Sequence, residues 1–166
     1  MLQPVQFRRL IAAMLVCASI VLGISVLAGS GRAASRPPGT HTCSVNDKQF
    51  LMTVQSNMTQ LSYWSDSLTS GDVASVVVIK QARAEAKQID ATRPTDTSMT
   101  TARTLLRQMF LEYAGAVRTK ALGGSPGKQV QTVYTLANYV HDLLVEAQPG
   151  MTAKGCNLEP LLSTSA

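Results

Sequence analysis

The chain has 166 residues, of which 45% are hydrophobic and 5% aromatic, and it carries 15 Lys and Arg against 10 Asp and Glu. This length suits one domain. The net charge of +5 belongs mostly to the amino-terminal 34 residues, which hold three arginines and no acid and leave 12 basic against 10 acidic residues beyond them. Those 12 are scattered among the acids and form no basic stripe of the kind that nucleic-acid-binding proteins carry, so we expect no nucleic-acid partner.

Residues 1–34 have the parts of an export signal. Arg8 and Arg9 precede 19 uncharged, mostly apolar residues, 10–28, and small residues follow. A positive start, an apolar stretch and small residues are typical of a signal peptide. Because the stretch is also long enough to span a bilayer, an uncleaved signal anchor is the alternative. Both predict a secreted or extracytoplasmic domain, which contacts the membrane only through residues 10–28 if the segment stays uncleaved.

Residues 35–43 are rich in Pro, Gly and Thr and predict a flexible linker before a four-helix domain over residues 44–166. Ser44, with Asp47 three residues later, is a capping-box pattern for the start of a helix. An apolar stripe at alternating spacings of four and three residues predicts the first helix over residues 46–69. The stripe consists of Phe50, Val54, Asn57, Leu61, Trp64 and Leu68.

The second and third helices show the same periodicity. Asp72 is placed to cap a helix over residues 72–91, which stops before Pro94 because a residue that precedes proline disfavours the helical conformation. The third helix is predicted over residues 96–122 and ends before a Gly-Gly pair, since glycine is common just past the end of a helix.

The fourth helix is predicted over residues 126–148. Ser125 suits the N-cap position and Pro126 suits the first helical position. Pro149, followed by glycine, is expected to end this helix. Residues 149–166 then form a carboxyl-terminal tail.

Four amphipathic helices joined by short turns predict an all-α, up-down-up-down four-helix bundle, preceded by the signal or anchor helix. An even number of antiparallel helices places the start of the first and the end of the fourth at one pole, where Cys43 and Cys156 would meet. Paired cysteines in an exported chain favour a disulfide, which would close the bundle. Two cysteines and two distant histidines are too few for a metal site, so we expect no metal.

The segment Gly-Gly-Ser-Pro-Gly, residues 123–127, matches G-x-S-x-G, the nucleophile elbow of serine hydrolases. That elbow needs a strand before the serine, whereas a helix is predicted before Ser125. Each residue of the segment also has a role in a turn between two helices. A serine hydrolase that uses Ser125 is therefore kept as the third of three functional hypotheses, and no enzyme activity is expected.

Tyr134 and His141 lie beside the apolar stripe of the fourth helix and are the candidate ligand-binding residues. They are either boundary residues of a packed core or ligands to a haem or a small apolar molecule held between helices. Small residues on the facing stripes, Ala82, Ala86 and Ala102, either leave space for such a ligand or let the helices approach each other. Native interiors leave few voids, so we expect close packing and no cofactor.

The first helix exposes mostly uncharged polar residues, and Asp66 is its only charge beyond the first turn. Charge depletion is typical of interface cores, although a solvated face fits the pattern equally well. We therefore expect an exported, non-catalytic binding or structural module at or beyond the cell surface, with a protein partner or an envelope component. A haem or small apolar ligand carrier is the alternative hypothesis.

Overall fold

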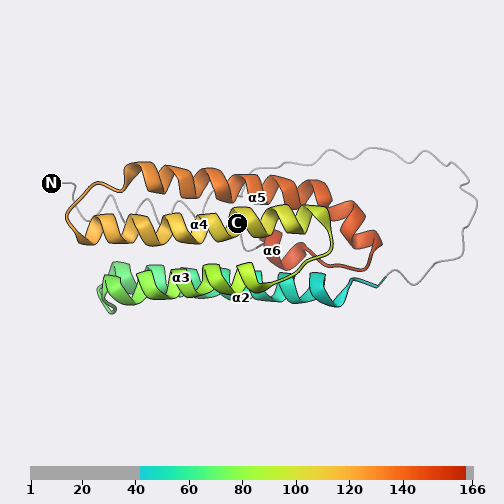
Figure 1. Cartoon of the computed structure of the whole chain (residues 1–166), viewed down its shortest axis with the longest axis horizontal. Coiled ribbons are helices and arrows are strands. Elements are labelled where there is room, and N and C mark those ends of the chain that lie inside the picture. Colours follow the sequence, from blue (N-terminus) through green and yellow to red (C-terminus); the bar gives the residue numbers. More distant parts are fainter. Residues whose placement is uncertain (1–41, 164–166) are drawn as a thin grey trace, which may run out of the picture.

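The computed structural model describes residues 42–163, whose regular structure is entirely helical (Figure 1). Four long helices and one short helix follow one another: α2 (Val45–Ser70), α3 (Ser75–Ala91), α4 (Thr97–Ala121), α5 (Gly127–Ala153) and α6 (Glu159–Ser163). The predicted all-α class with four packed helices is confirmed, and no strand occurs among these residues. The expected signal or anchor segment, residues 1–34, and most of the linker over residues 35–43 lie outside the described residues.

α2 and α4 each begin and end within one residue of their predicted positions. Both start where predicted because a polar side chain caps the first turn. The backbone N–H of Asp47 donates to Oγ of Ser44 at 3.0 Å and closes the first turn of α2. At the start of α4, the backbone N–H of Ser98 donates to Oδ1 of Asp96 at 2.9 Å. α2 ends at Ser70. Its C-cap residue, Gly71, has a φ of 85°, which lies in the left-handed region that favours glycine.

α3 begins at Ser75, three residues later than predicted, and Asp72 does not cap it. The backbone N–H of Asp72 instead donates to the carbonyl oxygen of Ser67 at 2.9 Å and completes the turn that ends α2. Its carboxylate accepts a hydrogen bond from the hydroxyl of Ser70. Ala74 therefore holds the N-cap position of α3 without a side-chain hydrogen bond. The predicted cap is wrong because Asp72 already serves the end of α2.

The predicted N-cap role of Ser125 is also wrong. α5 begins at Gly127, Pro126 holds the N-cap position, and no side chain caps the helix. Two glycines donate their N–H groups to the last turn of α4 at 3.0 and 2.9 Å, and the first of them, Gly123, has a φ of 79°. This Schellman arrangement ends α4 by backbone bonds alone. Ser125 lies exposed in the loop that follows.

α5 continues through Pro149 to Ala153, so its predicted end at residue 148 is wrong. Proline removes one backbone N–H and its ring crowds the carbonyl four residues earlier, which bends a helix that packing otherwise stabilises. The last turns of α5 bend toward α6 in Figure 1, and they place Met151, which is 2% exposed, in the core. The short helix α6, which the sequence did not predict, follows the buried Leu158.

α4 lies between α3 and α5 and packs along both, and consecutive long helices run in opposite directions (Figure 1). α2 packs mainly on α3, and α6 contacts both α2 and α5. The centre of these interfaces is one apolar core that includes Phe50, Val54, Ala86, Ile89, Met99, Leu106, Met109, Phe110, Val133, Val140 and Leu144. None of the helices within residues 42–163 has the length and the apolarity needed to cross a membrane.

The predicted disulfide between Cys43 and Cys156 is confirmed, and the two Cα atoms are 4.7 Å apart. It joins the residue before the N-cap of α2 to the loop between α5 and α6. The start of α2 and the end of α5 therefore meet at one pole, as expected for antiparallel helices. We call this end of the molecule, with the polar side chains of Ser44, Asp47 and Lys154, the disulfide pole.

Candidate functional site

The disulfide pole holds a buried carboxylate that is fully hydrogen bonded. Asp47 is 5% exposed and accepts four hydrogen bonds. The backbone N–H groups of Thr95 and Asp96 donate to Oδ1 at 2.7 and 3.2 Å. The hydroxyls of Ser44 and Thr95 donate to Oδ2 at 2.7 and 2.8 Å. Asp47 thus joins the start of α2 to the start of α4.

These donors decide the charge of Asp47. Burial by itself raises the pKa of this carboxyl group, but the hydrogen bonds from Ser44, Thr95 and Asp96 together hold the pKa of Asp47 below its ordinary value of 3.8. A hydrogen bond from Nζ of Lys154 at 2.8 Å likewise lowers the pKa of Asp96. The recess at this pole, of about 360 Å³, is lined by polar groups that already bind one another. We interpret this recess as a structural feature that connects the start of α2 to the start of α4.

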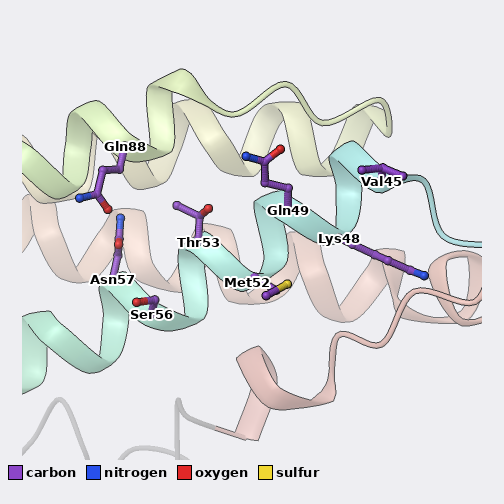
Figure 2. A pocket seen from close by; sticks show the side chains of 8 residues that line it. All are labelled: Val45, Lys48, Gln49, Met52, Thr53, Ser56, Asn57 and Gln88. Carbon is purple, nitrogen blue, oxygen red and sulfur yellow. The ribbon is translucent and has the colours of Figure 1, made fainter.

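A larger recess, of about 550 Å³, lies along α2 and α3, and we call it the α2–α3 groove (Figure 2). It is lined by Val45, Lys48, Gln49, Met52, Thr53, Ser56, Asn57 and Gln88. Figure 2 shows Gln88 of α3 and Asn57 of α2 turned toward each other, and Thr53 also points toward α3. Met52 lies farther from α3 and is 71% exposed.

The lining of the α2–α3 groove is mostly polar and carries a single charge. Lys48 is its one ionisable residue, and its other polar groups are amides and hydroxyls. Catalysis by a side chain needs an acid, a base or an activated nucleophile, and the eight lining residues bring no carboxylate, imidazole or thiol to these groups. Val45, at 81% exposed, is a second exposed apolar residue of the lining, two turns before Met52 on α2. The groove therefore combines amides and hydroxyls with one cation and two exposed apolar side chains.

Glu85 of α3 is a buried carboxyl group without a partner, and sequence reasoning missed it. The residue is 3% exposed, and neither carboxyl oxygen has a hydrogen-bond partner among the described residues. The side-chain amide of Asn57 donates to the backbone carbonyl of Glu85 at 3.2 Å and not to the carboxyl group. Burial raises the pKa of Glu85 to about 7. The available signal was its place three residues after Ala82 and four before Ile89, on the stripe that faces the core.

Tyr113 of α4 lies close to Glu85 and links α4 to α2. Its hydroxyl is hydrogen bonded to that of Ser65, with 2.6 Å between the oxygens. Burial raises the pKa of Tyr113, and the charges of Glu85 and Asp66 add to this rise while the bond with Ser65 opposes it. We call Asn57, Ser65, Glu85 and Tyr113, which connect α2, α3 and α4, the buried polar cluster.

The structure does not bring Ser125 and His141 together. Ser125 is exposed before α5, whereas His141 lies 14 residues after Gly127, at a distance of about 21 Å along the helix axis. His141 is the one histidine within residues 42–163. It is therefore out of reach as the base that would activate Ser125.

Tyr134 and His141 lie two turns apart on α5, and both are partly exposed. The Nδ1 atom of His141 is buried and has no hydrogen-bond partner in the described part of the chain. Ala82, Ala86 and Ala102 are all buried, and α3 packs along α4. Ligand binding at Tyr134 and His141 stays a prediction.

In the part of the chain that the structure describes, no three His, Cys, Asp or Glu side chains gather as metal ligands. Comparisons of the chain with known protein families, with curated proteins and with solved structures found no match. A function therefore has to be inferred from the residues of this chain themselves.

Proposed function

We propose that the protein is an exported, non-catalytic binding module that acts at or beyond the cell surface. In this proposal an up-down-up-down four-helix bundle follows a cleaved signal peptide or an uncleaved anchor, residues 1–34. The observation that carries the proposal is the disulfide between Cys43 and Cys156. Disulfides form and persist in oxidising compartments, which agrees with the charge and apolarity pattern of residues 1–34.

The α2–α3 groove is the proposed contact surface. Its uncharged polar lining and the exposed Met52 match the composition of interface cores, which are depleted in charge and enriched in methionine. The proposed occupant is a segment of a protein partner with uncharged polar side chains and one acidic group. Lys48, as the one ionisable residue of the lining, would pair with that acidic group.

Export is tested in cells that make the full chain. We expect the protein in the secreted or extracytoplasmic fraction, with Cys43 and Cys156 resistant to alkylation until a reductant is added. Deletion of residues 10–28 should leave the chain in the cytosol with two thiols that react at once. Recovery of the unaltered chain from the cytosol with both thiols free would refute export.

Binding is tested by a photo-cross-linking residue at Met52 in the full chain. Tyr139 on α5, which is 61% exposed, is the matched control position. We expect one protein adduct from position 52 and none from position 139. Lys48→Glu should weaken the adduct-forming complex by about tenfold, because it places like charges opposite each other. The absence of an adduct, equal cross-linking at both positions or indifference to Lys48→Glu would count against the groove.

A second candidate function, that of a haem or small apolar ligand carrier, rests on the Nδ1 atom of His141, which is buried and has no hydrogen-bond partner among the described residues. Titration of haem into the full chain tests this alternative, with His141→Ala and Tyr134→Phe as variants. We expect no saturable Soret shift, because native interiors leave few voids wide enough for a macrocycle. A saturable shift that either substitution abolishes would favour the carrier over the binding module.

A further inference from the structure

The two halves of α2 are held in the molecule to different degrees. We define residues 45–56 as the proximal half and residues 57–70 as the distal half. The proximal half buries three apolar side chains, Phe50, Leu51 and Val54. The buried side chains of the distal half are all polar, Asn57, Ser65 and Ser67.

Apolar residues of the distal half, among them Leu61 and Trp64, are only partly buried. Two hydrogen bonds of the buried polar cluster connect this half to its neighbours, one to the backbone of Glu85 on α3 at 3.2 Å and one to Tyr113 on α4 at 2.6 Å. Regions with few buried apolar contacts open locally at the lowest free energy. The distal half is therefore the part of α2 that can separate first.

Glu85 lies where the distal half begins, because Asn57 bonds its backbone carbonyl. Its carboxyl group is 3% exposed and has no hydrogen-bond partner among the described residues. An unpaired neutral carboxyl group costs far less free energy in such a place than an ionised one, which needs hydrogen-bond donors or water. The backbone N–H groups in the middle of a helix are already bonded within that helix. No side-chain donor among the described residues bonds either carboxyl oxygen. A carboxylate would therefore draw on water, which requires that a neighbouring helix moves.

The acidic and phenolic groups around Glu85 do not stabilise its charge. From α4 the titratable side chains are Tyr113, which interacts electrostatically with Glu85, and the adjacent Glu112. From α2 it is Asp66, whose charge acts on Tyr113. None of these groups brings a positive charge to Glu85, and the hydroxyl of Tyr113 is bonded to Ser65 and not to the carboxyl group.

The cations of the same helices are engaged elsewhere or exposed. Arg103 of α4 donates to the carbonyl of Thr92 at 3.0 Å. Arg107 of α4 faces the carboxylate of Asp90 at 3.7 Å on the surface. The remaining cations of the three helices are all exposed: Lys48, Lys80, Arg83, Lys87, Arg118 and Lys120. A carboxylate at Glu85 would therefore have no cation as a partner among the described residues of α2, α3 and α4.

We propose that a proton on Glu85 controls the position of the distal half of α2. With the proton bound, residues 57–70 pack on α3 and α4. Without it they move away, so that water reaches the carboxylate. The proximal half stays in place, because the disulfide and the hydrogen bonds of Asp47 hold it. This device does not depend on the proposed binding function.

The direction of the pH dependence follows from the two states of Glu85. In the closed state burial raises the pKa of Glu85 to about 7, against 4.5 for an ordinary glutamate, which we assign to the open state. Between these values the closed state binds more protons than the open state, so rising pH favours opening by up to about tenfold per unit. Below pH 4.5 and above pH 7 the equilibrium no longer depends on this group.

Hydrogen exchange of the full chain with its disulfide intact tests the proposal. Exchange is measured between pH 4.5 and pH 8 and corrected for the intrinsic rate at each pH. We expect the protection of residues 57–70 to fall by up to about tenfold per pH unit until pH 7 and then to level off. Protection of residues 45–56 and of α5 should stay constant. Trp64, the one tryptophan of the chain, should report the same midpoint by fluorescence.

Glu85→Gln, which cannot ionise, should abolish the pH dependence in residues 57–70. The control variant Glu146→Gln changes an exposed glutamate on α5 and should leave the pH dependence of residues 57–70 unaltered. If Glu85→Gln does not fold, Glu85→Met is the second variant that cannot ionise at this position. The pH midpoint for the loss of protection in residues 57–70 of the unaltered protein tests the proposal without any variant. Constant protection of the distal half, an equal loss along all helices, or a midpoint that survives in the Glu85 variants would overturn the proposal.

Discussion

Asp47 and Glu85 are both buried carboxyl groups, and they behave in opposite ways. Asp47 is 5% exposed and Glu85 is 3% exposed. Asp47 accepts four hydrogen bonds, and its pKa lies below the ordinary value. Glu85 has no partner for its carboxyl oxygens among the described residues, and its pKa rises to about 7. The available donors, and not burial alone, therefore decide whether a buried acid is charged.

The difference in donors comes from where each residue stands relative to helix ends. Asp47 faces the start of α4, where backbone N–H groups have no partner inside the helix. Glu85 faces the middle of long helices, where every such group is already bonded to the preceding turn. The disulfide pole is therefore expected to be the firm end of the molecule, and the buried polar cluster the weak part.

The largest expected effect on stability comes from removing the disulfide at the disulfide pole. Replacement of Cys43 and Cys156 by serine should lower the free energy of unfolding by about 4–5 kcal/mol, because the bond closes a loop of more than 100 residues. Urea denaturation of the full chain measures this. The reduced unaltered protein is the control and should match the double variant. A difference below about 1 kcal/mol would mean that the helices at this pole hold without the bond.

The next effect concerns the charge of Asp47. Asp47→Asn should lower the free energy of unfolding at pH 7 by about 2–3 kcal/mol, because buried donors lose a charged acceptor. Since folding lowers the pKa of Asp47 from 3.8, this stabilisation is present above pH 3.8 and is lost as the pH falls through the lower folded value. Asp66→Asn, on the exposed surface of α2, should change stability by less than about 0.5 kcal/mol. Equal effects of the two substitutions would contradict the comparison.

The third prediction has the opposite sign and concerns Glu85. Glu85→Gln should raise the free energy of unfolding at pH 8 by about 3 kcal/mol and leave it unchanged at pH 4.5. Folding raises the pKa of Glu85 from 4.5 to about 7, so its stabilisation is complete below pH 4.5 and is lost as the pH rises to 7. Denaturation curves at both pH values measure this. A destabilised variant at pH 8 would show that Glu85 has a partner when it is ionised.

The smallest expected effects compare two serines before helices. Ser44→Ala should lower the free energy of unfolding by about 1 kcal/mol, because Ser44 caps α2. Ser125→Ala should change it by less than about 0.5 kcal/mol, because Ser125 caps nothing. Thermal denaturation of both variants beside the unaltered chain is sufficient. A larger loss for Ser125→Ala would restore its predicted role as a cap.

Sequence periodicity predicted the four long helices and the pairing of Cys43 with Cys156, because an apolar stripe and a covalent bond depend on few neighbours. It failed where two elements compete for one residue, as at Asp72, which serves the end of α2 and leaves α3 uncapped. It also failed at Pro149, where the burial of Met151 outweighs a local preference to end the helix.

The candidate sites were less predictable than the fold. The charge-poor face of α2 was visible in the sequence, but the α2–α3 groove also needs Gln88 from another helix. The burial of Glu85 is not evident from the sequence, because a glutamate is normally solvated even where its spacing matches an apolar stripe. Its burial depends on how α2, α3 and α4 rotate about their own axes, which no local pattern specifies. The partner of a binding surface is likewise absent from the chain itself.

The disulfide pole has a mechanical consequence. Because Cys43 and Cys156 are joined, tension applied between the two ends of the chain passes through the sulfur–sulfur bond and bypasses the helices from α2 to α5. The force then passes through a short covalent link and through the segment after Cys156, which includes α6, while α2 to α5 carry no tension. If one end were fixed to the envelope and the other were pulled, the domain would transmit force while keeping its shape, as a tether does.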